Sequence, residues 1–244
     1  MSKPDFNISS ESRIRNTIQE KILNRELAPG DKMPSENVIA DEFKEKRIVV
    51  RNALVQLEKM GLLEGRQGIG RFVKARLPVI ELDMTGRRSF SDKMAAQSLP
   101  YESRIIFARY ATESEQKRYE QMIGTTGVAL FKVGRLRIVN DVPCAIHISY
   151  IREDVVPDIS YETDQLGSIF KYYNKKGITN LKSAGTQITT AFPTLSEQEY
   201  LECQELVPLI IYETQTIDID SDRRLEHTRI LYRSDLFKQQ IDIH

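Results

Sequence analysis

Residues 34–73 read PSENVIADEFKEKRIVVRNALVQLEKMGLLEGRQGIGRFV, and this stretch decides the fold of the N-terminal part of the chain. Four of its apolar residues follow the i, i+3, i+4, i+7 spacing of one helix face: Val50, Ala53, Leu54 and Leu57. Gly61 comes next, where a left-handed residue ends a helix at little cost. Two short apolar runs then flank a glycine-rich tip at residues 66–70, which predicts a hairpin. A helix-turn-helix followed by a basic hairpin indicates a winged helix-turn-helix domain, a fold that reads duplex DNA.

Two further helices are predicted before this one. The first spans about residues 11–26, begins at a Ser10 or Ser12 cap and carries a stripe of isoleucines: Ile14, Ile18 and Ile22. A Pro-Gly turn follows at residues 29–31. Ser35 is then expected to cap the second helix, whose apolar residues face inward: Val38, Ile39 and Phe43.

The composition is that of a globular protein. The chain has 244 residues, of which 40% are hydrophobic and 29% charged, and this length allows two domains of ordinary size. Cys144 and Cys203 lie far apart, without pairing or metal-ligand spacing, which is typical of a reducing compartment. The N-terminus carries no apolar leader, and no window approaches the roughly 18 consecutive apolar residues of a membrane span. We therefore expect a cytoplasmic protein with no membrane partner and no cofactor.

The net charge of zero hides an uneven distribution. Residues 1–76 carry 15 Lys and Arg against 11 Asp and Glu, a balance of +4, so the remaining 20 basic and 24 acidic residues give −4. A basic N-terminal domain on an acidic body is typical of an electrostatic footprint on nucleic acid.

A second domain is predicted for residues 88–244, after a linker at 77–87 that contains Pro78 and Gly86. Period-two patterns predict strands at 103–110, 128–139, 144–152, 181–192, 209–218 and 225–232, with helices between them at 113–122, 163–175 and 196–206. Asn140-Asp141 and residues 220–222 have the composition of hairpin turns. Hairpins imply antiparallel pairing, so the fold class is α+β.

The first 76 residues resemble the GntR family of bacterial transcriptional repressors. The matching stretches are LAPGDKMPSE at 27–36, VRNAL at 50–54, LE at 57–58, MGLL at 60–63 and GIGRFV at 68–73. The second domain resembles the UTRA effector domain of the HutC subfamily within that family, through RSFSDKM at 88–94, RLR at 135–137, SY at 149–150, LGSIF at 166–170 and LYRSD at 231–235. The resemblance implies a chorismate-lyase-like fold, a homodimer and a small-molecule effector.

The candidate DNA contacts lie on the second helix of the motif and on the wing. Arg47 and Arg51 stand at the start of the recognition helix, and Arg offers a bidentate fork to guanine; the family pattern puts a base-reading Arg at Arg47. Ile48 and Asn52 face away from the core stripe, toward a thymine methyl and a phosphate or adenine. The set is completed by residues of the wing and of the two helix starts: Arg66, Gly68, Gly70, Arg71, Ser35, Asn37 and Lys46.

The candidate effector contacts centre on Arg135 and Arg137, which share a strand face. Two guanidiniums on one face favour a phosphate, phosphonate or carboxylate between them, and a phosphosugar fits best. Backbone N–H groups at a helix start, together with the serines there, are expected to hold the same anion: Phe90, Ser91, Asp92 and Ser168. His147 lies opposite Arg135 if the intervening hairpin has an odd count. By the resemblance, Glu226 and Tyr232 face the polyol or amide part of the ligand.

These observations predict a ligand-responsive repressor that binds a palindromic operator as a homodimer. No metal-ligand spacing, Walker loop or catalytic serine motif occurs, so no catalytic residue is assigned and no enzyme is expected. Two alternatives stay open: a constitutive DNA-binding dimer whose second domain only dimerises, and a lyase-like enzyme. Three positions depart from the family pattern, which commonly has Gly at residue 44, Ser or Thr at residue 46 and Thr at residue 48. This chain has Lys44, Lys46 and Ile48 there, which predicts an operator that differs from the usual half-site.

Overall fold

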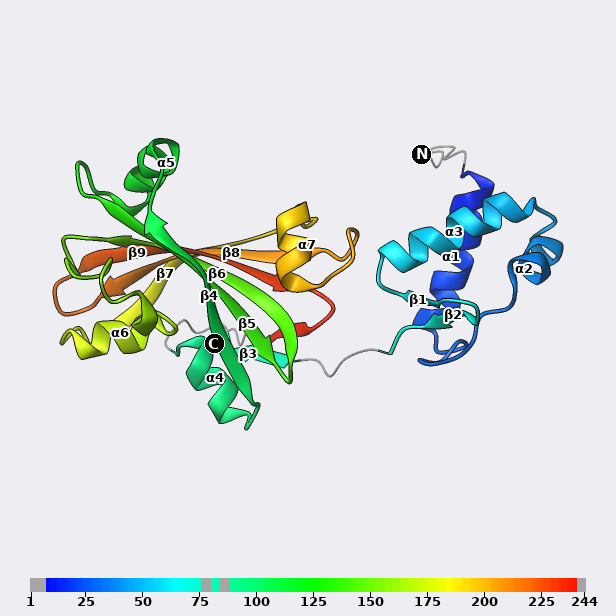
Figure 1. Cartoon of the computed structure of the whole chain (residues 1–244), viewed down its shortest axis with the longest axis horizontal. Helices are drawn as coiled ribbons and strands as arrows, with labels where there is room; N and C mark the ends of the chain where they lie inside the picture. The colour runs from blue at the N-terminus through cyan, green and yellow to red at the C-terminus, as the bar shows by residue number, and fades with distance from the viewer. Residues whose placement is uncertain (1–7, 76–79, 84–87, 241–244) are drawn as a thin grey trace, which may run out of the picture. The chain divides into compact units, whose positions relative to one another are not determined.

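The computed structural model describes residues 8–75, 80–83 and 88–240, and the chain divides into two compact units (Figure 1). The first unit holds the chain up to Leu77, and the second holds the chain from Pro78, except that Cys203–Val207 is grouped with the first. The domain boundaries expected at residues 76 and 88 stay predictions.

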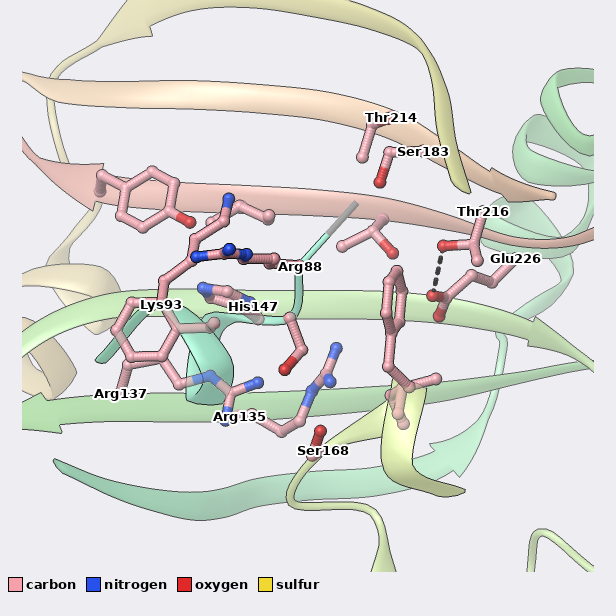
Figure 2. A pocket seen from close by; sticks show the side chains of 17 residues that line it. Arg88, Lys93, Arg135, Arg137, His147, Ser168, Ser183, Thr214, Thr216 and Glu226 are labelled. Carbon is pink, nitrogen blue, oxygen red and sulfur yellow. Dashed lines mark hydrogen bonds between the residues drawn. The ribbon is translucent and has the colours of Figure 1, made fainter. Parts of the chain in front are cut away.

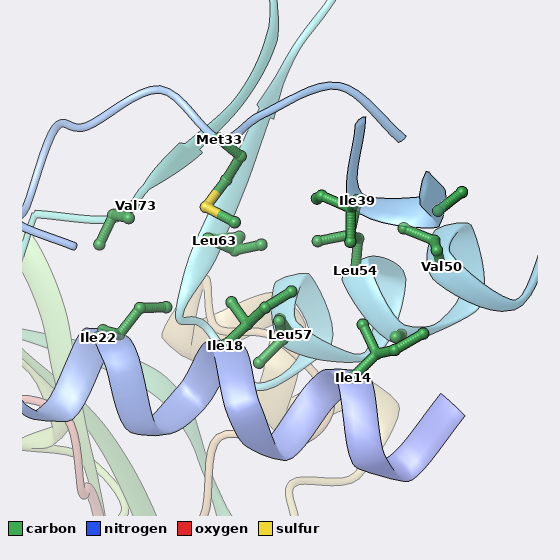
Figure 3. Packing of buried hydrophobic residues seen from close by; sticks show 12 residues of the cluster. Ile14, Ile18, Ile22, Met33, Ile39, Val50, Leu54, Leu57, Leu63 and Val73 are labelled. Carbon is green, nitrogen blue, oxygen red and sulfur yellow. The ribbon is translucent and has the colours of Figure 1, made fainter. Parts of the chain in front are cut away.

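The first unit is a three-helix domain with a hairpin. It contains α1 (Ser10–Leu23), α2 (Glu36–Phe43), α3 (Arg47–Lys59), β1 (Leu63–Arg66) and β2 (Gly70–Val73). The strands β1 and β2 pair antiparallel, as expected of a wing. Figure 3 shows the isoleucine stripe of α1 facing the apolar stripe of α3, and all seven predicted side chains are at most 8% exposed: Ile14, Ile18, Ile22, Val50, Ala53, Leu54 and Leu57. The predicted winged helix-turn-helix is confirmed.

Three local expectations for this unit differ from the structure. Helix α1 ends at Leu23 and is capped by Ser9, because Ser9 accepts the backbone N–H of Ser12. Val38 does not face inward: its side chain is 55% exposed, since α2 has only two turns and buries Ile39 and Ala40 instead.

The second unit is built on a six-stranded antiparallel sheet in the order β4-β5-β6-β9-β8-β7. The strands are β4 (Tyr101–Tyr110), β5 (Leu130–Val139), β6 (Val142–Arg152), β7 (Leu181–Ala191), β8 (Leu209–Asp218) and β9 (Arg223–Arg233). The helices are α4 (Phe90–Ala96), α5 (Glu113–Ile123), α6 (Ile169–Lys175) and α7 (Leu195–Leu201), with a 3₁₀ turn η1 (Thr163–Gln165) before α6. The antiparallel α+β class is confirmed.

The predicted linker at 77–87 contains a strand. Residues 80–83 form β3 (Ile80–Asp83), which pairs in parallel with β10 (Phe237–Gln240) near the other end of the unit. The sequence IELD alternates apolar and acidic residues, the period of a strand, but Pro78 and Gly86 hide the pattern. Four residues of the predicted linker therefore form a strand.

Helices cover both faces of the six-stranded sheet within the second unit. Helices α4 and α6 lie on one side and α5 and α7 on the other (Figure 1). On the first side, Ile169, Tyr172 and Tyr173 of α6 pack on Phe131 and Val133 of β5. On the second side, Tyr119 of α5 stacks on Tyr150 of β6 with ring centroids 3.7 Å apart. Polar residues on the first side are thereby enclosed between the sheet and two helix starts.

Candidate functional site

The predicted DNA contacts lie at the starts of α2 and α3 and on the wing. Ten of the eleven are exposed: Ser35, Asn37, Lys46, Arg47, Ile48, Arg51, Asn52, Arg66, Gly68 and Gly70. Ile48 is 57% exposed. Val38 on α2 and Ile69 at the wing tip are equally exposed, at 55% and 58%, and the expected set omits both.

Glu36 connects the three elements that carry this surface. Its carboxylate accepts from the Nε of Arg47 on α3 at 2.7 Å and from an amino group of Arg71 on the wing at 2.9 Å. Arg71 also donates to Glu58 at 2.9 Å. The bond from Arg47, opposed by partial burial, holds the pKa of Glu36 below its usual range. Arg71 is therefore paired within the domain and ties the wing to α2 and α3, whereas Arg66, Gly68 and Gly70 of the wing are exposed.

The turn between α2 and α3 contains two lysines at positions that other residue types usually occupy. Lys44 ends α2 in the left-handed region, with φ of 54° and ψ of 44°, a conformation that costs a non-glycine residue roughly 1–2 kcal/mol. Lys46 occupies the N-cap position of α3 and makes no side-chain cap bond. Ser35 does cap α2, accepting from the N–H of Val38 at 3.4 Å. The N-cap of α3 is therefore a lysine with no capping bond, and its positive charge stands at the start of the helix.

A cavity lies on the α4 and α6 side of the sheet in the second unit. Its volume is about 110 Å³. Seven predicted effector residues line it: Phe90, Arg135, Arg137, His147, Ser168, Glu226 and Tyr232. Figure 2 shows Arg137 and Glu226 toward opposite sides of this pocket, with Arg135 between them. Residues from two helix starts and five strands thus meet at one place.

Two buried arginines occupy one end of the pocket. Arg137 donates to the hydroxyl of Ser103 at 2.6 Å and to the carbonyl of Gly167 at 2.7 Å, and its guanidinium lies 5.3 Å from the ring centre of Phe90. Burial and the charge of Arg135 lower the pKa of Arg137 to about 9, so the group stays charged at neutral pH. Arg135 donates to the hydroxyl of Ser149, and burial lowers its pKa as well.

His147 lies directly opposite Arg135 on the neighbouring strand, as predicted. The cause is not an odd loop, because Asn140 and Asp141 form a two-residue turn with φ of 49° and 62°. A bulge supplies the shift instead: Arg137 pairs with Ala145 but Ile138 pairs with Pro143, so Cys144 is the extra residue. Without it, a one-residue slip would turn His147 to the other face.

His147 is a neutral residue among cations. Burial and the charges of Arg137, Arg135 and Lys93 hold its pKa well below 6.5. Its ring meets Phe90 and Tyr232 edge-on, with centroids 5.3 and 5.6 Å away. The imidazole is thus positioned by two aromatic rings and is free of positive charge at neutral pH.

The other end of the pocket is rich in hydroxyl groups. Thr216 donates to a carboxylate oxygen of Glu226 at 2.8 Å, the bond drawn in Figure 2. Thr214 and Thr228 on β8 and β9 and Ser183 on β7 line the same space. Burial raises the pKa of Glu226, while the charge of Arg135 opposes that shift. This end offers alternating donors and acceptors rather than charge.

Eight buried side-chain atoms of the described residues lack a hydrogen-bond partner, and four of them belong to residues that line this pocket. They are Nε of Arg135, Nε of Arg137, Nε2 of His147 and Oε2 of Glu226. Buried polar atoms are nearly always paired, and an unpaired one costs about 1–3 kcal/mol. Their convergence on one cavity points to a polar ligand.

Two predicted effector residues do not line the cavity. Asp92 closes a capping box, accepting from the N–H of Ser89 at 3.3 Å and from its hydroxyl at 2.6 Å. Ser91 is buried beside Ser89, with their hydroxyl oxygens 2.8 Å apart. Both side chains lie at the start of α4, and neither lines the pocket. The N-cap of α4 is Ser89, which the sequence pattern alone did not distinguish from Ser91.

Several lining residues were missed by the sequence reasoning: Arg88, Ser89, Lys93, Ser183, Thr214, Thr216 and Thr228. The spacing of two along β8 and β9 could have predicted the threonines, because residues two apart on a strand share a sheet face. Thr214 and Thr216, and likewise Glu226, Thr228 and Tyr232, follow this rule. Among the described residues, no group of three His, Cys, Asp or Glu side chains is arranged to hold a metal ion. No described helix is long and apolar enough to cross a membrane.

Comparison with known proteins defines the class. Residues 11–73 match the family of bacterial regulatory proteins called gntR, and residues 99–238 match the UTRA domain. The chain is 27% identical over 225 residues to the transcriptional repressor NagR of Bacillus subtilis, covering 92% of this chain and 90% of that protein. It is 24% identical to MngR of Escherichia coli, repressor of a mannosyl-D-glycerate transport/metabolism system, covering 93% and 92%.

The fold also matches a solved structure. PhnF from Mycobacterium smegmatis superimposes with a TM-score of 0.59 at 22% sequence identity, covering 95% of this chain and 99% of that one. The fold and the domain matches together define a DNA-binding transcriptional regulator with an effector domain, and not an enzyme. The chain belongs to the GntR family and carries a UTRA domain, as in the HutC type of regulator.

Proposed function

We propose that this regulator is a repressor whose affinity for a palindromic operator is controlled by a small anionic metabolite, most simply a phosphosugar. The convergence of four unpartnered buried polar atoms on one cavity carries the proposal. The regulator acts on genomic DNA and therefore works in the cytoplasm.

The arginine end of the pocket supports an anion. Arg135 and Arg137 are 4% and 3% exposed, and Arg88 and Lys93 add further positive charge to the lining. Glu226 is the one acidic side chain among the described lining residues. Buried charges are costly unless they are paired, so the excess of cations favours a ligand that brings negative charge. A phosphate offers oxygen acceptors to both unpartnered Nε groups.

The hydroxyl end supports a sugar body. Thr214, Thr216, Thr228 and Ser183 present hydroxyl groups, and Glu226 presents a carboxylate oxygen without a partner. Such groups bind the vicinal hydroxyls of a sugar, each of which both donates and accepts. A sugar bearing a carboxylate is the second candidate, because the name of MngR includes mannosyl-D-glycerate, which carries its negative charge on a carboxylate.

A thermal-shift screen of the full chain tests the ligand class. Glucose 6-phosphate, glucosamine 6-phosphate and glucuronate serve as probes, with glucose and inorganic phosphate as half-ligand controls. A ligand at a hundredfold excess over its Kd stabilises the folded unit by about 2.7 kcal/mol. We expect a shift with a hexose phosphate that exceeds the sum of the shifts from both controls. A flat response to every hexose phosphate contradicts the phosphosugar assignment, and a shift with glucuronate alone supports the carboxylate.

The operator is expected to differ from the usual family site. Lys46 and Ile48 stand at the end of α3 that enters the major groove. Family members commonly carry Ser or Thr at the position of Lys46 and Thr at the position of Ile48. A homodimer places two such helices in successive grooves about 34–36 Å apart. Binding measurements on the chain's own promoter and on the usual half-site test this. Tight binding to the usual site that Ile48→Thr leaves unchanged is the contrary result.

A constitutive DNA-binding dimer is the second candidate function. Strand β7 lies at one edge of the sheet and carries no Lys, Arg, Asp or Glu from residue 183 onward, which favours a role of the second unit in dimerisation. That role alone predicts no thermal shift with any anion.

A further inference from the structure

His147 is a buried histidine in the middle of strand β6, and the charged groups around it are cations. It lies directly opposite Arg135 on β5, and Arg137 follows two residues further along that strand. Lys93 of α4 adds a third positive charge that acts on the imidazole, and Arg88 lines the same pocket. His147 is 6% exposed, and its Nε2 has no hydrogen-bond partner among the described residues. These surroundings favour the neutral form of the ring.

The other titratable groups near the ring do not offset these charges. Tyr232 of β9 meets the ring edge-on, and burial raises the pKa of its hydroxyl, so that it stays neutral. Burial likewise raises the pKa of the Cys144 thiol on β6 to about 12. Asp92 of α4 is bonded to Ser89 within the capping box. Glu226, the one acidic side chain of the described lining, lies toward the other end of the pocket (Figure 2).

An anion in the pocket changes the balance at the imidazole. A phosphate that accepts from the unpartnered Nε groups of Arg135 and Arg137 brings its negative charge into the cavity that Nε2 of His147 also faces. A negative charge nearby favours the protonated form of a histidine and opposes the effect of the cations. A protonated ring donates from both of its nitrogens, so Nε2 gains a charge-assisted bond to the anion.

We propose that His147 takes up a proton from the solvent when the anion binds, and that this step makes the pocket select a doubly charged head group. The inference rests on the proposed function and deepens it by naming the charge of the ligand. A phosphate monoester carries close to two negative charges at neutral pH, whereas a carboxylate or a sulfate ester carries one. The second charge strengthens the attraction to a protonated ring, so the gain in affinity from the proton is larger for a phosphate.

The proton uptake gives ligand binding a defined pH dependence. Without ligand, the pKa of His147 lies well below 6.5, and the bound anion raises it. Between the two pKa values, each ligand that binds brings a proton with it. The affinity therefore rises as the pH falls through that interval, by up to about tenfold per pH unit. Above the pKa of the bound state, this dependence disappears.

Isothermal titration calorimetry of the full chain with glucose 6-phosphate tests the uptake. Titrations near neutral pH in PIPES, HEPES and Tris give a binding enthalpy whose slope against the ionisation enthalpy of the buffer counts the protons. Wild type is expected to give a slope of about 0.5 to 1. His147→Gln keeps a donor for the anion but does not titrate, and its slope is expected near zero. Equal slopes in wild type and His147→Gln overturn the proposal.

His227→Gln is the matched control for that variant. His227 is the second buried histidine of the described chain, but it packs against Tyr119 of α5 and does not line the pocket. Its substitution is expected to leave the slope at the wild-type value. The second ionisation of the phosphate, near pH 6, contributes equally in all three proteins and cancels in the comparison.

Glucose 6-sulfate tests the selection of charge, because it replaces the phosphate by a group with a single fixed charge. Wild type is expected to bind glucose 6-phosphate at least about tenfold more tightly than the sulfate. In His147→Gln this ratio is expected to fall at least about threefold. A ratio that the substitution leaves unchanged contradicts the selection.

A spectroscopic measurement on the wild type covers a variant that fails to fold. The chain has three histidines, so the imidazole signals in a magnetic resonance spectrum are few. Saturation with glucose 6-phosphate near neutral pH is expected to move the signal of His147 to the chemical shift of an imidazolium. Binding with a slope of zero and an unchanged His147 signal overturns the inference alone. A wild type that binds no hexose phosphate overturns the phosphosugar assignment of the proposed function.

Discussion

Arg135 of β5 lies directly opposite His147 of β6, and the extra residue Cys144 in β6 puts them there. The pairing places a buried cation beside an imidazole whose pKa is held well below 6.5. Both side chains keep one unpartnered nitrogen. The pocket therefore holds buried charge and unpartnered nitrogen atoms, which have measurable consequences for stability and binding.

Arg137→Met is expected to separate stability from ligand binding. The substitution removes a buried charge that Arg135 repels, and it leaves Ser103 bonded to the carbonyl of Gly167 at 2.9 Å. We expect the free energy of unfolding without ligand to rise by about 1 kcal/mol, as when buried charges give way to apolar residues. The affinity for a hexose phosphate is expected to fall at least about 30-fold, or 2 kcal/mol. Calorimetric titration and chemical denaturation measure the two quantities.

Arg104→Met is the control for that variant. Arg104 is an exposed arginine on β4, paired with Glu102, and it does not line the pocket. Its substitution should change neither quantity. A ligand affinity that is equal in wild type and Arg137→Met contradicts the assignment of the anion site.

His147→Gln is expected to flatten the pH dependence of stability. The folded-state pKa of His147 lies well below the 6.5 of the unfolded chain, so the unfolded state binds the proton first. The stability that this residue contributes is complete above about pH 6.5 and is lost as the pH falls below it, by up to about 1.36 kcal/mol per unit. Denaturation curves from pH 7.5 to 5.5 give the slope. Subtracting the variant's curve removes the opposite contribution of Glu226, whose pKa is raised.

Lys44→Gly is expected to stabilise the first unit. Lys44 has φ of 54°, and glycine adopts this conformation without the cost borne by a side chain. We expect the free energy of unfolding to increase by about 1 kcal/mol. Lys46→Gly is the matched control, because Lys46 has φ of −70° and gains nothing from glycine. Equal effects of the two substitutions contradict a strained turn.

The success of these sequence inferences depended on the range of the contacts involved. The helix stripes of the first unit and the paired arginines of β5 follow from local periodicity, and both were predictable. Two bulges arise from the pairing of whole strands: Cys144 in β6 against β5, and the register shift between Ala184 and Gln187 in β7 against β8. No local residue pattern predicts either of them. Strand β3 needs β10, some 150 residues later, so its short pattern was interpreted as part of a linker. The ion pairs of Arg71 reach Glu36 and Glu58 on two helices, so the residues next to Arg71 could not predict them.

Arg47→Ala and Arg66→Ala are expected to weaken DNA binding in different ways. Arg47 stands at the first turn of α3, so its loss should cost about 1–3 kcal/mol on the operator and relax specificity at one base pair. Arg66 on the wing contacts the ring of Phe72 at 4.2 Å and is expected to meet the backbone of DNA. Its loss should weaken binding to operator and scrambled duplex alike, and reduce the salt slope by about one. Fluorescence anisotropy at several salt concentrations distinguishes the two; identical profiles contradict the assignment.

The central claim is that an anion in the second unit controls the affinity of the first for DNA. Fluorescence anisotropy on a labelled duplex from the chain's own promoter, with and without saturating glucose 6-phosphate, tests it most directly. A coupling of about 1–3 kcal/mol predicts an operator affinity that changes about 5- to 150-fold with ligand, and a change that disappears in Arg137→Met. An operator affinity that is the same with and without every hexose phosphate that binds the protein would contradict the account.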